Sequence, residues 1–378
     1  MEREHYQHLV KNAEKIVVKV GTSTLTHSTG KLNLERIERL VRQLSDLRNQ
    51  GKEVVLVSSG AIGAGMGKLN LDKRPKTIPE KQAVAAIGQG ILLHLYEKMF
   101  AEYGQTTAQL LLTKADLEHR QRFLNARNTL LTLLDLGVIP IVNENDTVAF
   151  EEIKFGDNDT LAALVATLID ADLVILLTDI DGFYNADPRK NKDAQRLAVV
   201  EQIDESIEGK AGSVGSKFGS GGMATKIIAA KIAVNAGIPL MIALGSEPDI
   251  IGQIISGESV GTLFVPQEIK PHLRKSWIAF GSHVQGNIIV DDGAKEALLH
   301  KGKSLLPGGI TAVEGTFAAG DVVHILDLQG KEIARGISNY SQQEIMKIKG
   351  QKTKDICSIL GYKDYDEVIH RDNLSIFV

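Results

Sequence analysis

The chain has 378 residues, of which 43% are hydrophobic and 24% are charged, and its formal net charge is −4. This length exceeds the roughly 250–300 residues at which a single core stops growing, so we expect two domains. The composition is close to that of ordinary globular proteins, which argues against a polyanion-binding protein and against a disordered acidic tail.

Cysteine content and hydropathy indicate the compartment. Cys357 is the only cysteine, so an internal disulfide is excluded, and the charged start Met1–His5 does not resemble a signal peptide. We therefore expect a cytoplasmic protein. The most apolar region, residues 161–177, is interrupted by Asp170 and Asp172 and is too short for a membrane span of roughly 20 residues.

From residue 15 to about residue 265, short β-branched runs alternate with longer stretches of helical spacing. Residues 34–47 repeat apolar side chains at the i, i+3, i+4, i+7 positions of an amphipathic helix, and Gly51 is a plausible end. This alternation predicts βαβ units around an open, mostly parallel α/β sheet. The predicted strands are residues 16–20, 54–57, 138–142, 173–177 and 239–243.

After Pro266 the apolar runs become short and the turn signals lie close together, as in residues 326–331. Short strands at that spacing indicate a small β-rich barrel or sandwich. The segment from Pro266 to Arg274, which contains two prolines and charges of both signs, is the best linker. We expect a first domain at 1–265, a linker at 266–274, a second domain at 275–355 and a C-terminal tail at 356–378.

Two motifs directly follow predicted strands near the N-terminus. Lys19 lies in an apolar run that ends in Gly21-Thr22-Ser23, and Ser59-Gly60 opens a glycine-rich stretch after the next strand. Backbone amides and a lysine at the carboxyl edge of a sheet could meet a phosphate or carboxylate. A solvated lysine and a glycine turn for tight packing are the structural alternatives.

Two polar clusters lie close together in the middle of the chain. Asn143 to Asp146 follows a predicted strand, and residues 156–159, Gly-Asp-Asn-Asp, open a helix-like run. Ligands of open α/β sheets bind beyond the carboxyl ends of the strands, where the first cluster should lie. Asn and Asp also favour turns and helix caps, but two such clusters within about twenty residues favour a site.

Two further loops could bind a nucleotide. Residues 178–189 form an acid-rich loop after a predicted strand, in which Asp179 and Asp181 could approach a metal or a ribose hydroxyl, although such residues are also ordinary turn formers. Residues 215–226 form a glycine loop whose amides, with Lys226, could hold polyphosphate. A flexible glycine linker is the structural alternative, and the chain has no GxxxxGK[ST] motif.

The ten histidines are scattered without metal-ligand spacing, and no catalytic histidine or cysteine constellation emerges. A carboxylate acceptor is ionised at neutral pH and needs no general base. Its phosphorylation could rely on lysines, amides and Mg²⁺ to offset charge on the transferring phosphoryl group.

Taken in this order, the motifs resemble the amino-acid kinase family and, within it, the glutamate 5-kinase branch. The loop 178–189 resembles a signature shared more widely in the family. Residues 290–336 look like a PUA domain, which bacterial members of this branch commonly carry. The matching blocks are residues 19–23, 58–62, 111–113, 123–127, 143–146, 156–159 and 221–226.

The resemblance implies the amino-acid kinase fold, an open, mostly parallel sheet sandwiched by helices, and transfer of the ATP γ-phosphoryl group to the side-chain carboxylate of L-glutamate. It implies ATP and Mg²⁺, feedback inhibition by proline, and a homo-oligomer, either a dimer or a tetramer. In catalysis, Lys19 and Lys226 would stabilise the phosphoryl group while Asp157 holds the two lysines.

The resemblance also assigns binding residues. The substrate set would be Ser59, Gly60, Asn143, Asp146 and Asn158, with Asp146 suited to the ammonium group of glutamate. The ATP set would be Lys19, Thr178, Asp179, Ser220, Gly221, Gly222, Met223, Ala224, Thr225 and Lys226. Residues 58 and 224 depart slightly from the family pattern, without consequence for the mechanism.

Other activities remain open on the sequence. Acetylglutamate, aspartate or carbamate kinases would share the lysines and the loop at Thr178, but the Ser59-Gly60 motif and the two polar clusters favour glutamate. RNA binding by the PUA domain is the alternative of another class. Residues 274–355 carry 11 Lys/Arg and 9 Asp/Glu, a net charge of +2 that does not indicate the basic patch such binding usually needs.

Overall fold

The computed structural model describes residues 6–27, 29–148, 158–186, 188, 191, 193–212, 222–266 and 284–377. Its contacts divide the chain into two compact units, one of residues 1–117 and 121–270, the other of residues 118–120 and 271–378. Of the linker that we predicted at 266–274, only Pro266 lies among the described residues. No helix in these ranges is long and apolar enough to cross a membrane.

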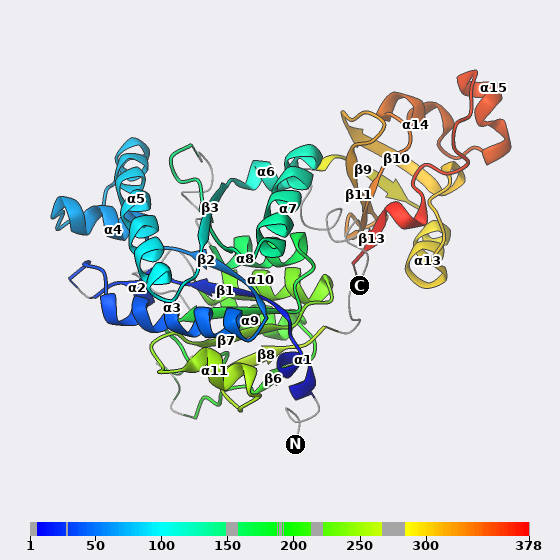
Figure 1. Ribbon diagram of the computed structural model, residues 1–378. Coiled ribbons are helices and arrows are strands. Elements are labelled where there is room, and N and C mark those ends of the chain that lie inside the picture. The colour runs from blue at the N-terminus through cyan, green and yellow to red at the C-terminus, as the bar shows by residue number, and fades with distance from the viewer. Residues whose placement is uncertain are drawn as a thin grey trace. The chain divides into compact units, whose positions relative to one another are not determined.

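The first unit is built on an eight-stranded sheet in the order β3-β4-β2-β1-β5-β7-β8-β6 (Figure 1). All neighbours pair in parallel except β7 and β8, which are antiparallel. The five strands predicted from β-branched runs are therefore confirmed as β1, β2, β4, β5 and β7, and β3, β6 and β8 are additions. The strands are β1 (Lys15–Val20), β2 (Glu53–Ser58), β3 (Thr107–Leu112), β4 (Ile139–Glu144), β5 (Leu173–Thr178), β6 (Val199–Val200), β7 (Leu240–Leu244) and β8 (Thr262–Phe264).

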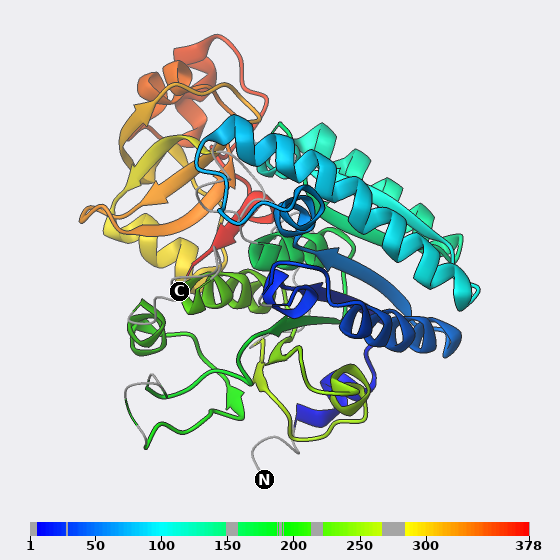
Figure 2. The same cartoon turned by 90° about the vertical axis from the view of Figure 1, so that its left-hand side faces the viewer.

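Helices cover the sheet, as Figures 1 and 2 show. The helix predicted at residues 34–47 is α3, whose N-cap Asn33 accepts a hydrogen bond from Arg36 N, and Gly51 follows its end with a φ of 91°. The helices are α1 (Gln7–Lys11), α2 (Thr22–Leu25), α3 (Leu34–Asn49), α4 (Ala61–Leu69), α5 (Ile78–Glu102), α6 (Lys114–Glu118), α7 (Arg120–Asp135), α8 (Asn158–Leu168), α9 (Glu205–Gly212), α10 (Met223–Asn235) and α11 (Ile250–Ile255).

The alternation of side chains along β1 separates the core from the site. Ile16, Val18 and Val20 belong to the buried cluster that includes apolar residues of α3, α5 and α11. Because side chains alternate along a strand, Val17 and Lys19 face the other side of the sheet, where α8 packs. One buried strand thus contributes to the core on one face and presents a lysine on the other.

The second unit contains a five-stranded sheet in the order β10-β9-β11-β12-β13, mostly antiparallel, with only β9 and β11 parallel. The prediction of a β-rich second domain is confirmed. Its elements are β9 (Val284–Val290), α13 (Asp292–Lys301), β10 (Ile310–Gly315), β11 (Val322–Leu326), β12 (Glu332–Ile337), α14 (Gln342–Ile348), α15 (Ile356–Leu360) and β13 (Leu374–Ile376), with 3₁₀ turns at Pro307–Gly309, Thr353–Asp355 and Arg371–Asn373.

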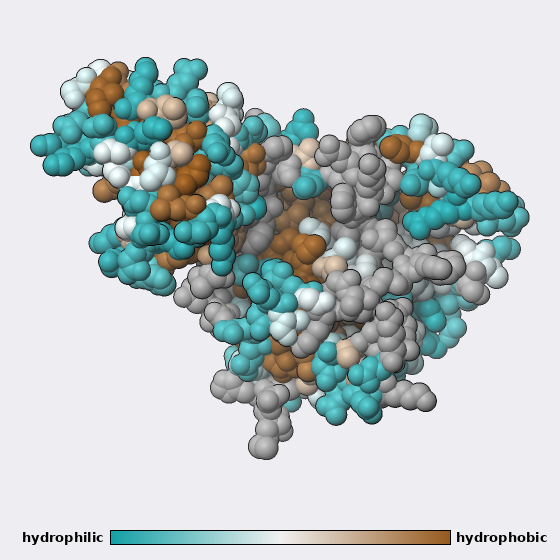
Figure 3. Space-filling view, turned by 180° about the vertical axis from the view of Figure 1, so that it is seen from behind, coloured by the Kyte–Doolittle hydropathy of each residue, from teal (hydrophilic) through white to brown (hydrophobic). Residues whose placement is uncertain are grey.

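The last residues of the chain differ from our expectation of a tail at 356–378. They supply α15 and the edge strand β13, which pairs antiparallel with β12. Val368, Ile369 and Leu374 are buried in the core of the second unit. Burial of these apolar side chains removes them from water, so this segment folds as part of the second unit. In the view of Figure 3, the surface of the second unit is mainly hydrophilic, with apolar residues in scattered areas.

Candidate active site

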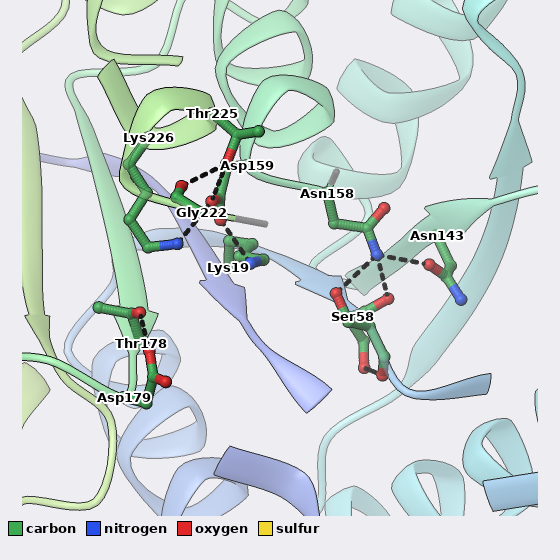
Figure 4. A network of polar contacts seen from close by, with 11 residues as sticks. Lys19, Ser58, Asn143, Asn158, Asp159, Thr178, Asp179, Gly222, Thr225 and Lys226 are labelled. Carbon is green, nitrogen blue, oxygen red and sulfur yellow. Dashed lines mark hydrogen bonds and ion pairs between the residues drawn. The ribbon is translucent and has the colours of Figure 1, made fainter. Parts of the chain in front are cut away.

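The predicted polar motifs meet at the carboxyl ends of four adjacent parallel strands, β4, β2, β1 and β5. The strand that follows β1 in the chain, β2, lies on one side of β1 in the sheet, and β5 lies on its other side. The direction in which strands are added therefore reverses between β1 and β5. Ligands of open α/β sheets bind at such a switch point. Two groups of polar side chains lie there, as Figure 4 shows.

The first group is a buried cluster of three charges. Asp159, fully buried in the first turn of α8, contacts Lys19 Nζ through Oδ1 and Lys226 Nζ through Oδ2, the latter at 3.0 Å. Lys19 and Lys226 are only 6% and 4% exposed. Burial alone would raise the pKa of Asp159, but the two ammonium groups outweigh burial and hold this pKa well below its ordinary range. One carboxylate thus holds two ammonium groups, so the cluster of three side chains carries a net positive charge.

Asp159 makes the contacts with both lysines that we expected of Asp157, and Asp157 itself lies outside the described residues. The structure thus brings Lys19 and Lys226 together on one shared partner. A signal for Asp159 was present in the sequence, because Asp159 shares one helical face with Ala162, Ala163 and Ala166, all of them buried. A carboxylate on a buried helix face requires a cationic partner.

The second group joins Asn158, Asn143 and Ser59, three of the predicted substrate residues. Asn158 Nδ2 lies 2.8 Å from Ser59 Oγ, 2.8 Å from Asn143 Oδ1 and 3.1 Å from the carbonyl oxygen of Ser58, so these three acceptors share its two N–H groups. Asn158 Oδ1 is buried, and no donor among the described residues meets it. An unpaired buried acceptor of this kind suits a donor group on a ligand.

Ser59 belongs to a sharp turn that connects β2 to α4. Gly60 has a φ of 99°, a left-handed conformation that favours glycine, and the helix α4 begins at the next residue. Ser58 is buried, and its Oγ lies 2.9 Å from the hydroxyl of Tyr96 on α5. Burial raises the pKa of Tyr96 well above its ordinary value, so this phenol remains a hydrogen-bond donor at neutral pH.

Asp146, which we also predicted to bind the substrate, lies in the turn after β4 and is partly buried. Asn143 and Glu144 belong to the end of β4 itself, whereas we expected the strand to stop at residue 142. Asn143 is therefore held in the sheet, at 3% exposure, while Asp146 lies beyond it.

The loop after β5 is held by the sheet. Thr178 is buried, and its Oγ1 donates to Asp179 Oδ1 at 3.0 Å. Further along, Thr262 Oγ1 accepts a hydrogen bond from Phe183 N at 2.8 Å and donates to the carbonyl oxygen of Leu197 at 2.6 Å. This fully buried threonine of β8 therefore joins both ends of the loop to the sheet, a contact that the sequence did not indicate.

The predicted glycine loop is described only from Gly222, so Ser220 and Gly221 lie outside the described residues. Gly222 is the N-cap of α10, and Thr225 Oγ1 donates to its carbonyl oxygen at 2.7 Å. Met223 and Lys226 are buried, whereas Ala224 is exposed. Lys226 accordingly lies in the first turn of α10, and the free backbone amides of a helix start together with a lysine are suited to an anion.

Comparison with known proteins identifies both units. A family model described as the amino acid kinase family matches residues 14–244, and a PUA domain model matches residues 286–360. A glutamate 5-kinase from Caldanaerobacter subterraneus subsp. tengcongensis is 59% identical over 362 residues, which cover 96% of this chain and 97% of that relative. One from Moorella thermoacetica is 57% identical over 364 residues, which cover 96% of both chains.

Among solved structures, a UMP kinase from Bacillus anthracis covers 69% of this chain and 99% of its own, with a TM-score of 0.46 and 16% identity. The family model spans more than half of the present chain, and the curated relatives match it almost from end to end. The chain therefore belongs to the amino acid kinase family, within its glutamate 5-kinase branch, and carries a C-terminal PUA domain.

Proposed function

We propose that this protein transfers the γ-phosphoryl group of ATP to the side-chain carboxylate of L-glutamate, giving L-glutamyl 5-phosphate in the first step of proline biosynthesis. The observation that carries the proposal is the junction at Asn158 and Asp159. These neighbouring residues join an amide and hydroxyl group on one side to two buried lysines on the other.

In the proposed reaction, a carboxylate oxygen of glutamate forms a bond to the γ-phosphorus while the bond from that phosphorus to the β,γ-bridging oxygen breaks. ADP leaves with the bonding electron pair. The attacking carboxylate is already ionised, so no general base is required. Lys19 and Lys226 would offset the charge on the transferring group and on ADP, and Asp159 would hold both ammonium groups in place.

For ATP, we assign the binding residues Thr178, Asp179 and the start of α10 from Gly222 to Lys226, together with Ser220 and Gly221. Mg²⁺, when bound to ATP, would neutralise part of the phosphate charge. The described ranges contain no group of three or more His, Cys, Asp or Glu side chains that could hold a metal ion. The residues that are present fit a metal ion carried largely by the phosphates.

For glutamate, we assign Ser59, Gly60, Asn143, Asp146 and Asn158. Asp146 would pair with the ammonium group, and the unpaired Oδ1 of Asn158 could accept from a substrate donor. We include in the proposal feedback inhibition by proline, a homo-oligomeric assembly and a cytoplasmic location. Their support is the near end-to-end similarity to glutamate 5-kinases and, for the location, the single cysteine.

The proposal is tested by measuring ADP formation from ATP with glutamate, acetylglutamate, aspartate or carbamate as acceptor, each with and without proline. Of the four acceptors, we expect only glutamate to support turnover, and we expect proline to lower that turnover. Turnover confined to acetylglutamate would overturn the assignment of the substrate, and turnover that proline does not change would remove only the inhibitor from the proposal.

A further inference from the structure

The amino-acid side of the site continues into helix α5, through a residue that the proposed reaction has not used. Gln89 is half-buried on α5, and its Oε1 accepts a hydrogen bond from Asn143 Nδ2 at 2.7 Å. Asn143 in turn accepts from Asn158 Nδ2 at 2.8 Å. Three amide side chains from α5, β4 and α8 therefore form one hydrogen-bonded chain.

The direction of donation along these hydrogen-bonded amides is determined at Asn143. The backbone N–H of Glu144 donates to Asn143 Oδ1 at 2.9 Å, and a backbone N–H can only donate. That side-chain atom must therefore be the carbonyl oxygen, so the NH₂ group of Asn143 points at Gln89 and needs an acceptor there. Without Gln89, the NH₂ group of a residue that is 3% exposed would lose this acceptor.

The backbone of α5 packs closely against α4 next to Gln89. A Cβ atom on Gly88 would lie 1.7 Å from the carbonyl oxygen of Ala61, the first residue of α4. The two helices thus meet backbone to backbone beside Gln89, directly after the turn at Gly60. This contact fixes the backbone of α5 beside Gln89 relative to α4, with little freedom.

We propose that Gln89 is a positioning residue for the amino-acid pocket. It holds the Asn143 amide in one orientation, and Asn143 then holds Asn158 with its NH₂ group towards Ser59. The inference rests on the proposed function, because it concerns the pocket assigned to glutamate. It predicts an effect on the amino-acid substrate and none on ATP, whose assigned residues lie on β5 and α10.

The test compares Gln89→Leu, which removes the acceptor, with Gln89→Glu, which keeps one. Glu97→Leu is the matched control, since Glu97 is an exposed residue of the same helix. We expect the glutamate KM to rise about tenfold in Gln89→Leu and to stay near the wild-type value in the other two variants. The ATP KM should not change in any of them.

A readout independent of turnover is the side-chain amide spectrum of protein labelled with ¹⁵N-asparagine. The Asn158 resonances should shift in Gln89→Leu and not in Gln89→Glu, although the hydrogen bonds connect Gln89 to Asn158 only through Asn143. Unchanged Asn158 resonances in Gln89→Leu, or equal changes in the Leu and Glu variants, would overturn the inference. A wild-type enzyme without glutamate turnover would instead refute the proposed function, and the spectra would still decide the role of Gln89.

Discussion

At the scale of single residues, the site depends on charges that are almost completely removed from water. Asp159 is the central residue, because it offsets the two buried ammonium groups of Lys19 and Lys226. Removing Asp159 would leave two buried ammonium groups without their shared carboxylate, and an uncompensated buried charge usually costs several kcal/mol. Asp159 is therefore expected to influence both turnover and stability.

Replacement of Lys19 by alanine should lower kcat by about 10²–10³-fold, because it removes one of the two cations that we propose to stabilise the transferring phosphoryl group. Steady-state kinetics with saturating ATP and glutamate would measure this loss, and circular dichroism would check the fold. Near-normal kcat in a folded Lys19→Ala protein would remove Lys19 from the mechanism.

The Asp146→Asn variant should chiefly raise the glutamate KM, by about tenfold, because the amide cannot offer a negative charge to the substrate ammonium. The kcat value should remain close to that of the wild type. A large fall in kcat at unchanged KM would show that the assignment of Asp146 is mistaken.

Acid should weaken the fold through Asp159. Its pKa is lowered in the folded protein, so its stabilising contribution is complete above its ordinary pKa of about 4 and is lost as pH falls towards the depressed folded value. Within that window the single proton changes the free energy of unfolding by up to about 1.4 kcal/mol per pH unit. Urea denaturation at pH 3–5 should show a shallower pH dependence for Asp159→Asn than for the wild type. Equal slopes would mean that Asp159 does not contribute in this way.

At the scale of elements, the amino-acid side of the site depends on the packing of α4 against α5. Gly65 of α4 approaches α5 closely, because an added Cβ would lie 2.0 Å from the carbonyl oxygen of Val84. Gly88 of α5 approaches α4 in the same way, because an added Cβ would lie 1.7 Å from the carbonyl oxygen of Ala61. These distances are far below van der Waals contact, and both neighbouring atoms belong to the backbone, so the helices could accept a side chain only by moving apart.

Two glycine substitutions on one helix should thus have opposite effects. Gly88→Ala should destabilise the protein by about 1–3 kcal/mol through overpacking against Ala61. Gly90→Ala should stabilise it by about 0.5–1 kcal/mol, because no atom lies within 4 Å of its Cβ position and alanine favours helix. Urea denaturation of both variants gives the comparison. Equal effects at the two positions would contradict the close approach of α4 and α5.

At the scale of the whole molecule, each of the two compact units has a hydrophobic core of its own among the described residues. One includes β1, β2 and α3, and the other includes β9, β11 and α14. The cores share no residue, and each belongs to one of the two compact units. Units with their own cores can in principle fold alone.

A chain ending at residue 266 should accordingly unfold cooperatively and retain turnover with glutamate. Calorimetry of the full chain should resolve a second transition of about 60–80 kcal/mol near 60 °C, as expected for a unit of roughly 100 residues. A single transition for the full chain, together with an unfolded truncated chain, would indicate that the two cores form only together.

Several features of the molecule follow from local sequence alone. The β-branched runs determine the five predicted strands, because they can be buried only inside a covered sheet, and the spacing at residues 34–47 determines α3. Lys19 stood out as a charge within an apolar strand, and its burial beside a partner is confirmed. The position of these motifs at strand ends was enough to predict a candidate site at the carboxyl edge of the sheet.

The tertiary structure alone decided which distant residues meet. The apolar helix face that carries Asp159 was visible in the sequence, but only the packing of α8 against β1 brings Asp159 to both lysines. Gln89, Tyr96 and Thr262 carry no local signal, because their partners lie 38–79 positions away along the chain. Sequence patterns report the period and burial of each element, whereas contacts between side chains depend on how the elements pack.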